Sequence, residues 1–305
     1  MTRRLLRAVL GVLLGSCLAG CESMVAVTEL GTTVAVATGN LTPEQAESIN
    51  RSSAAVEKTF EDITPEQEYY IGRTVAATLL HTDKPYSAEA ANEYVNRVGQ
   101  SLALFCDRPE LFLGYRFQIM DTDDVNAFGA PGGFILVSRG MLRCCRSEDA
   151  LAAVLAHEIG HVEKRHGLRA INKSRITSAL TTLGAASAEN FGGKDLAELT
   201  RTFEDSIADV TSALVNSGYS RKYEHEADAA AVAILSRTGY DPWALIDMLA
   251  QMEQRLKPGG LDFAKTHPPP KDRIKDIRSM LDPHAPPVPA TAARQARFEA
   301  ALKGI

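Results

Sequence analysis

A pair of histidines at the end of an apolar run constrains this chain more than any other feature. His157 and His161 stand four residues apart, directly after the apolar residues 151–156. Ser147 is a typical N-cap for a helix here, and the acidic residues after it favour the positive end of a helix. Because residues four apart share one helix face, both imidazoles can bind one metal ion. The spacing therefore predicts a metal site on a helix.

Glu158, between the two histidines, predicts hydrolytic chemistry at that site. Its side chain is rotated away from their face, so it can take a proton from an attacking water without binding the metal. A zinc ion would lower the pKa of water and polarise a carbonyl group. We therefore expect Glu158 to be the general base of a zinc-dependent metalloendopeptidase.

A catalytic zinc ion needs a third protein ligand and keeps one position open. Glu224 and Asp228 share the apolar face of a second expected helix, and an inward pair of carboxylates is costly unless a positive group lies opposite. We expect Glu224 to be the third ligand of one zinc ion per chain, and Asp228 to accept a hydrogen bond from a ligating histidine. The alternative is a set of solvated helix charges, which fits His225 and Glu226 better than Glu224.

The remaining pattern predicts a helix-dominated α+β fold with a small sheet and an active-site helix. Alternating residues favour strands at 115–120 and 134–137, and the segment 126–133 between them must turn sharply. Residues 168–218 are expected to be helical, with a break near residue 192. Cap residues and helical spacing predict further helices at 65–80, 88–104, 220–235 and 242–256.

The N-terminus is typical of a secretory signal, with three arginines, a short apolar stretch and then small residues. The stretch is shorter than the roughly 20 apolar residues that span a bilayer. Residues 18–21 resemble the bacterial lipobox, which implies lipid on Cys21; a plain cleaved signal is the alternative. By the same resemblance, Glu22 favours the periplasmic face of the outer membrane. The expected organisation is a signal peptide at 1–20, a tether and entry helix at 21–62, a metallopeptidase domain at 63–282, and a Pro/Ala linker with a short helix at 283–305.

Cys106, Cys144 and Cys145 remain in the expected mature chain, an odd number for an oxidising compartment. We expect one disulfide, from Cys106 to either Cys144 or Cys145, and one thiol. A structural zinc site on the three is the weaker alternative, because no histidine lies beside them at ligand spacing.

The charge balance argues against nucleic acid as a partner. The chain has 305 residues, with 33 Lys and Arg against 38 Asp and Glu, and a formal net charge of -5. Proteins that bind nucleic acid normally present a basic face, and aromatic residues at 6% provide few platforms for base stacking. We expect no nucleic-acid partner.

Four motifs together resemble metallopeptidase family 48, the group that contains the CAAX prenyl proteases, HtpX and the BepA-like periplasmic proteins. The motifs cover roughly residues 65–280 and comprise 157–161, Glu224 with Asp228, 126–133, and 266–268 with Arg273. The resemblance implies a zincin-like fold with Glu158 as general base. The chain resembles the soluble lipoprotein branch, and we expect no tetratricopeptide array such as that of BepA.

The resemblance also implies roles for two further segments. Gly132, Gly133 and Phe134 resemble the edge strand that pairs with an extended substrate; an ordinary core strand is the alternative. His267 resembles a histidine that can approach zinc as a fourth ligand and shut the site. His267 and Arg273 are therefore regulatory or transition-state candidates, and Arg273 is expected to support the carboxylates or the loop.

The other histidines, His81, His166 and His284, have no partners at useful spacing, so we expect them at the surface.

Two functions follow from these expectations. The first is a membrane-anchored periplasmic endopeptidase that hydrolyses misfolded or misassembled envelope proteins in protein quality control. The alternative is a latent-site lipoprotein that acts mainly as a chaperone or assembly factor for outer-membrane proteins. The expected partners are unfolded envelope proteins, the membrane through lipid on Cys21, and the outer-membrane assembly machinery.

Overall fold

The computed structural model divides the chain into two units, Met1–Ile63 and Thr64–Ile305. It describes residues 63–170, 204–255, 267, 269–283, 288 and 291–305, together with the isolated residues 33, 36, 37 and 43. The predicted signal, the lipid site at Cys21, the entry helix, the break near residue 192 and His284 lie outside the described residues. The second unit holds all the secondary structure considered below.

A small mixed sheet organises this unit. Its strands are β1 (Arg116–Met120), β2 (Ala127–Ala130) and β3 (Phe134–Ser138), in the spatial order β1-β3-β2. β3 runs parallel to β1 and antiparallel to β2. β2 is therefore an edge strand, in a segment where the sequence predicts only a sharp turn. All of its residues are buried, so it has no alternation of apolar and polar residues to signal a strand.

Phe134 begins the central strand of the sheet. It pairs with Arg116 on one side and with Ala130 on the other. The prediction that Gly132, Gly133 and Phe134 form the substrate-binding edge is therefore wrong. The two glycines instead form the tight turn η2 (Pro131–Gly133), where their φ values of 68° and 88° favour glycine.

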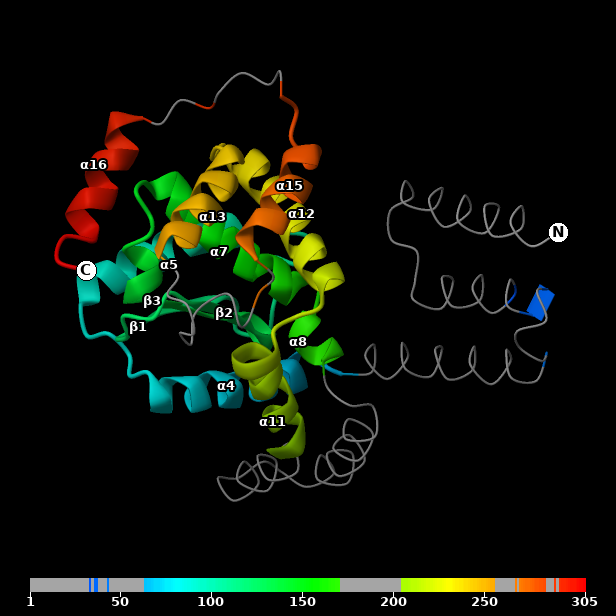
Figure 1. Cartoon of the computed structure of the whole chain (residues 1–305). Coiled ribbons are helices and arrows are strands. Elements are labelled where there is room, and N and C mark those ends of the chain that lie inside the picture. Colours follow the sequence, from blue (N-terminus) through cyan, green and yellow to red (C-terminus); the bar gives the residue numbers. More distant parts are fainter. Residues whose placement is uncertain are drawn as a thin grey trace. The chain divides into compact units, whose positions relative to one another are not determined.

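Two helices cover opposite faces of the sheet, α7 (Glu148–Glu163) above it and α4 (Pro65–Thr82) below it in Figure 1. Every residue of α7 is buried, which fits a helix that is apolar on nearly all sides. The side chain of Ser147 accepts a hydrogen bond from Ala150 at the start of α7. At the start of α4, Thr64 and Gln67 form the reciprocal pair of hydrogen bonds that their spacing predicts.

Most of the remaining helices lie on the same side of the sheet as α7, whereas α11 (Glu204–Ser212) packs against α4 (Figure 1). The remaining helices are α5 (Glu89–Ala103), α6 (Arg139–Leu142), α8 (His166–Arg169), α11, the π-helix η3 (Ala213–Ser217), α12 (Arg221–Thr238), α13 (Trp243–Arg255), α15 (Pro270–Met280) and α16 (Ala292–Ala301). The expected helix-dominated α+β fold with a small sheet is confirmed. None of the helices in the described ranges is both long and apolar enough to cross a membrane.

The C-terminal helix α16 joins the core at the start of α7. Phe298 is buried, and Arg297 forms an ion pair with Glu148, the first residue of α7. The same carboxylate accepts hydrogen bonds from the hydroxyls of Tyr94 and Tyr240, each at 2.8 Å. The compact unit thus continues beyond residue 282 to Ile305.

The three cysteines of this unit are buried thiols. The sulfur of Cys106 lies 3.4 Å from the Tyr115 hydroxyl, and those of Cys144 and Cys145 contact the carbonyl oxygens of the helical turn before them. The predicted disulfide is therefore wrong. Cys144 and Cys145 follow the short helix α6 and direct their side chains back along it, which satisfies each thiol locally.

Candidate metal centre

The candidate metal centre lies where α7 packs on α12. His157, Glu158 and His161 are on α7 and Glu224 is on α12, and all four are at most 2% exposed. The helices approach closely because Gly160 has no side chain: a Cβ atom there would lie 2.9 Å from the carbonyl oxygen of Ala227. This packing thus brings together residues that are more than sixty positions apart.

The donor atoms of the predicted ligands converge. The Nε2 atoms of His157 and His161 lie 3.1 Å apart. The Oε1 atom of Glu224 lies 3.4 Å from Nε2 of His161, and its Oε2 atom lies 3.6 Å from Nε2 of His157. Ligand atoms that bind zinc at about 2.0–2.1 Å in a tetrahedron lie roughly 3.4 Å from one another. The spacing therefore fits a small divalent cation.

The chemistry of these groups also fits a cation. The Nδ1 atom of His157 faces the carboxylate of Asp228 at 3.0 Å, so a proton belongs on Nδ1 and Nε2 is the atom that can bind a cation in the cluster. Burial lowers the pKa of His161 well below its usual value, so its imidazole is neutral. Although burial lowers the pKa of His157, hydrogen bonds with Asp228 and Glu224 raise it to about 9, so a bound cation would displace the Nε2 proton. The cation would then be held by two nitrogen lone pairs and the Glu224 carboxylate.

Asp228 and Arg273 contact side chains of the cluster and each other. The Nη2 and Nε atoms of Arg273 lie 2.5 and 3.0 Å from the two carboxylate oxygens of Asp228. Asp228 therefore orients His157 while its own charge is balanced by a buried guanidinium. Arg273 also approaches Glu224, with an Nη1 to Oε2 distance of 3.6 Å. Asp228 and Arg273 are therefore both in contact with side chains of the cluster, and their supporting roles stay a prediction.

His166 lies beside His161, so its predicted surface position is wrong. It is fully buried, and its Nδ1 atom lies 2.9 Å from Nδ1 of His161. Its Nε2 atom lies 2.9 Å from a carboxylate oxygen of Glu226. Arg165 has a φ of 56°, in the left-handed region, and this turn folds the chain back so that His166 reaches His161.

His267 completes a group of four residues whose donor atoms lie within 4.8 Å of one another: His157, His161, Glu224 and His267. The Nδ1 atom of His267 lies 2.8 and 2.9 Å from the two oxygens of Glu224. The structure thus places this histidine at the metal cluster. Of the other two histidines predicted at the surface, His81 is exposed.

Glu158 faces the edge strand β2. A Cβ atom on Gly129 of this strand would lie 3.3 Å from Oε2 of Glu158 and 2.5 Å from its backbone oxygen. The Oε1 atom of Glu158 is buried and has no hydrogen-bond partner among the described residues. Burial raises the pKa of this carboxyl group, and a raised pKa suits a general base that works near neutral pH.

The profile of peptidase family M48 matches residues 89–281. The chain belongs to this family. The matched range contains the four residues of the metal cluster and the supporting pair Asp228 and Arg273. The resemblance to metallopeptidase family 48 is thereby confirmed.

The chain spans about half of the length of the individual relatives that it matches. The Beta-barrel assembly-enhancing protease of Escherichia coli is 28% identical over 229 residues, which are 72% of this chain and 44% of the relative. The Mitochondrial metalloendopeptidase OMA1 of Schizosaccharomyces pombe is 32% identical over 194 residues, which are 62% of this chain and 52% of the relative. OMA1 of Saccharomyces cerevisiae is 29% identical over 226 residues, which are 69% of this chain and 60% of the relative.

Proposed function

We propose that this chain is a zinc metalloendopeptidase. The observation that carries the proposal is the convergence of His157, His161 and Glu224 beside the buried carboxylate of Glu158. These three residues would hold one zinc ion, and zinc supplies Lewis-acid activation of water and of a peptide carbonyl. Glu158 takes the proton of the attacking water and returns it to the leaving amine.

The edge strand β2 offers a backbone on which a substrate can align. The amide of Ser138 donates to the carbonyl oxygen of Asn126 at 3.0 Å, which makes these two residues a hydrogen-bonded pair. Such pairs alternate along an antiparallel ladder, so Phe128 and Ala130 bond to β3 while Gly129 presents its N–H and C=O groups outward. An extended peptide bonded to Gly129 would lie beside Glu158 and is recognised through its backbone.

The test is cleavage of casein, an unstructured protein, by the wild-type chain and by Glu158→Gln. We expect the variant to bind zinc as the wild type does and to lose cleavage by at least a hundredfold, the range typical of general-base loss. Glu163→Gln, the same change on the same helix, is the matched control and should keep cleavage. Equal turnover by Glu158→Gln and the wild type would overturn the mechanism.

The cellular role that we propose is hydrolysis of misfolded or misassembled envelope proteins at the periplasmic face of the outer membrane. It is supported by the signal-like N-terminus with Cys21 and by the similarity to a protease named for β-barrel assembly. Interaction with the outer-membrane assembly machinery is part of the same proposal. Metabolic labelling with a fatty acid should mark the wild-type chain and leave Cys21→Ser unlabelled; equal labelling of both would exclude the anchor.

The position of His267 favours a second candidate, a latent site in a chaperone or assembly factor. With its Nδ1 atom 2.8 Å from Glu224, this side chain occupies space that a substrate carbonyl would need at the cluster. If the site is latent, His267→Ala raises casein cleavage severalfold, whereas Glu158→Gln leaves the binding of unfolded protein unchanged. Strong cleavage by the wild type that His267→Ala does not increase would exclude latency.

A further inference from the structure

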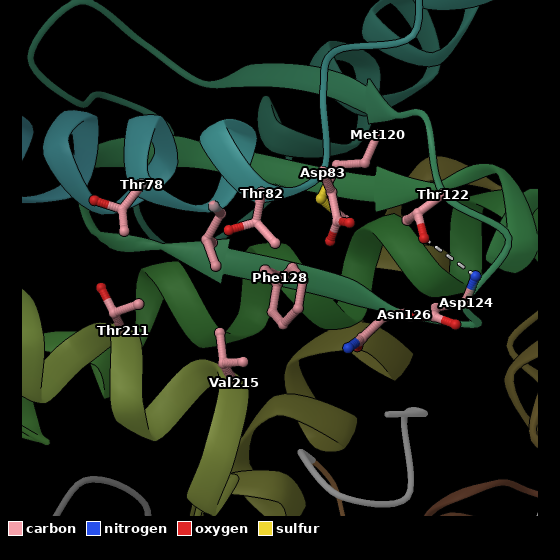
Figure 2. Close-up of a pocket in the computed structure, with 11 residues that line it drawn as sticks. Thr78, Thr82, Asp83, Met120, Thr122, Asp124, Asn126, Phe128, Thr211 and Val215 are labelled. Carbon is pink, nitrogen blue, oxygen red and sulfur yellow. Dashed lines mark hydrogen bonds between the residues drawn. The ribbon is translucent and has the colours of Figure 1, made fainter. Parts of the chain in front are cut away.

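A cavity of about 250 Å³ lies between α4, β2 and η3 (Figure 2). Its lining includes Leu79 and Asp83 at the end of α4, Phe128 of β2 and Val215 of η3. Pockets for whole small-molecule ligands usually measure about 300–1,000 Å³. The volume therefore suits one long side chain better than a complete ligand.

The cavity is lined by Phe128, the neighbour of Gly129, whose backbone faces Glu158. Successive side chains of a strand point to opposite faces of a sheet. A Cβ atom on Gly129 would point at Glu158 of α7, so Phe128 points to the other face, and Figure 2 shows its ring at the cavity.

The same alternation fixes which substrate residues face the cavity. In a peptide strand added beside β2, the residue opposite Gly129 points toward α7, and its two neighbours point to the face that carries Phe128. A substrate aligned for attack near Glu158 therefore directs a neighbouring side chain into the cavity. This step rests on the proposed peptidase function.

The lining combines apolar walls with two carboxylates. Leu79, Phe128 and Val215 provide apolar surface, while Asp83 and Asp124 contribute negative charge. Neither carboxylate takes part in an ion pair with the described part of the chain. Burial and the nearby charge of Asp124 raise the pKa of Asp83, so a positive group here would relieve both effects.

We propose that this cavity is a specificity pocket for a long basic side chain, Lys or Arg, of the substrate. The aliphatic stem packs on the walls made by Leu79, Phe128 and Val215, and the cationic end lies between Asp83 and Asp124. Long basic side chains commonly bury their stems on apolar surface while the charged end meets a polar group. The pocket thus adds side-chain selection to the backbone recognition at β2.

The test measures binding, so it does not depend on turnover. The full-length Glu158→Gln chain, loaded with zinc, is titrated with fluorescent peptide libraries in which one position is fixed as Lys, norleucine or Glu. Norleucine keeps the length of the lysine stem without its charge. We expect Lys to bind about fivefold more tightly than norleucine at a defined position, as one partly exposed ion pair allows, with Glu binding most weakly.

Two double variants, both made in the Glu158→Gln chain, locate the source of that preference. Asp83→Asn with Asp124→Asn should abolish the preference for Lys over norleucine. Glu66→Gln with Glu110→Gln removes two exposed carboxylates that do not line the cavity, and it should leave the preference intact. The absence of any Lys preference, or its persistence in the Asp83/Asp124 variant, would overturn the pocket. A Lys preference in a chain whose wild type cleaves no casein would overturn the proposed function alone.

Discussion

The Nδ1 atoms of His161 and His166 lie 2.9 Å apart in the buried interior of the site. His166 in turn contacts Glu226, so the proposed zinc ligand His161 is linked through a second histidine to a partly exposed carboxylate. Burial lowers the pKa of His166, and a neutral ring can accept from His161 and donate to Glu226. Hydrogen bonds of this kind fix the orientation and the tautomer of a metal ligand.

We expect His166→Phe to weaken zinc binding about 10–100-fold, the usual loss when such a partner is removed. Phenylalanine keeps an aromatic ring that can stack on Tyr223, whose centroid lies 4.5 Å away. The phenyl ring is slightly larger than imidazole and has no nitrogen atom to bond His161. The measurement is the zinc dissociation constant by competition with a chelator. Tyr223→Phe keeps the same stack and should bind zinc normally. Wild-type affinity in His166→Phe would show that His166 does not orient His161.

We expect Arg297→Ala to lower the free energy of unfolding by about 1–2 kcal/mol at neutral pH, because it leaves the buried carboxylate of Glu148 with fewer donors. Urea unfolding followed by circular dichroism measures this difference. Lys303→Ala, an exposed change after the same helix, should have no effect. If the free energy of unfolding of Arg297→Ala equals that of the wild type, Arg297 of α16 does not stabilise the start of α7.

The effect of Arg297 should depend on pH. Burial raises the pKa of Glu148, but hydrogen bonds from Arg297, Tyr94 and Tyr240 outweigh it, so that the pKa lies below its usual value of 4.5. A depressed pKa in the folded state gives stability that is present above the unfolded-state value and is lost as the pH falls through the folded-state value. The stability difference between wild type and Arg297→Ala should therefore shrink below about pH 4.5. A difference that stays constant down to pH 3 would contradict this linkage.

We expect Gly129→Ala to reduce casein cleavage at least tenfold while zinc stays bound. The added methyl group would lie 2.5 Å from the backbone oxygen of Glu158, so β2 and α7 must move apart and the edge strand no longer aligns with the catalytic carboxylate. Zinc content and cleavage rate are measured on the same preparation. Wild-type cleavage by this variant would argue against β2 as the substrate-binding edge.

The cysteines should react as thiols. Because Cys106, Cys144 and Cys145 are unbridged and buried, alkylation in denaturant without a reducing agent should modify all three. Mass spectrometry of the digested chain detects the modified peptides. Detection of a disulfide-linked peptide that joins Cys106 to Cys144 or Cys145 would contradict the structure and show that the predicted disulfide forms.

Much of the site could be predicted because its signals are local to single helices. The four-residue spacing of His157 and His161, and of Glu224 and Asp228, fixes a shared face on each helix before any tertiary contact forms. The caps at Thr64 and Ser147 likewise depend on residues three positions away. Such short-range patterns can be recognised directly from the spacing of residues in the sequence.

The sequence by itself determined the fold class, the helix that carries His157, Glu158 and His161, and the inward carboxylates of α12, since helical periodicity specifies which side chains share a face. Only the tertiary structure decided that β2 is an edge strand, that His166 reaches His161 and Glu226, and that the cysteines form no disulfide. Those features depend on which segments lie side by side. A buried strand of four residues has no alternation of apolar and polar residues, and a single left-handed residue such as Arg165 has no sequence pattern either. The distances between the side chains of the site are set by the packing of α7 against the sheet and against α12.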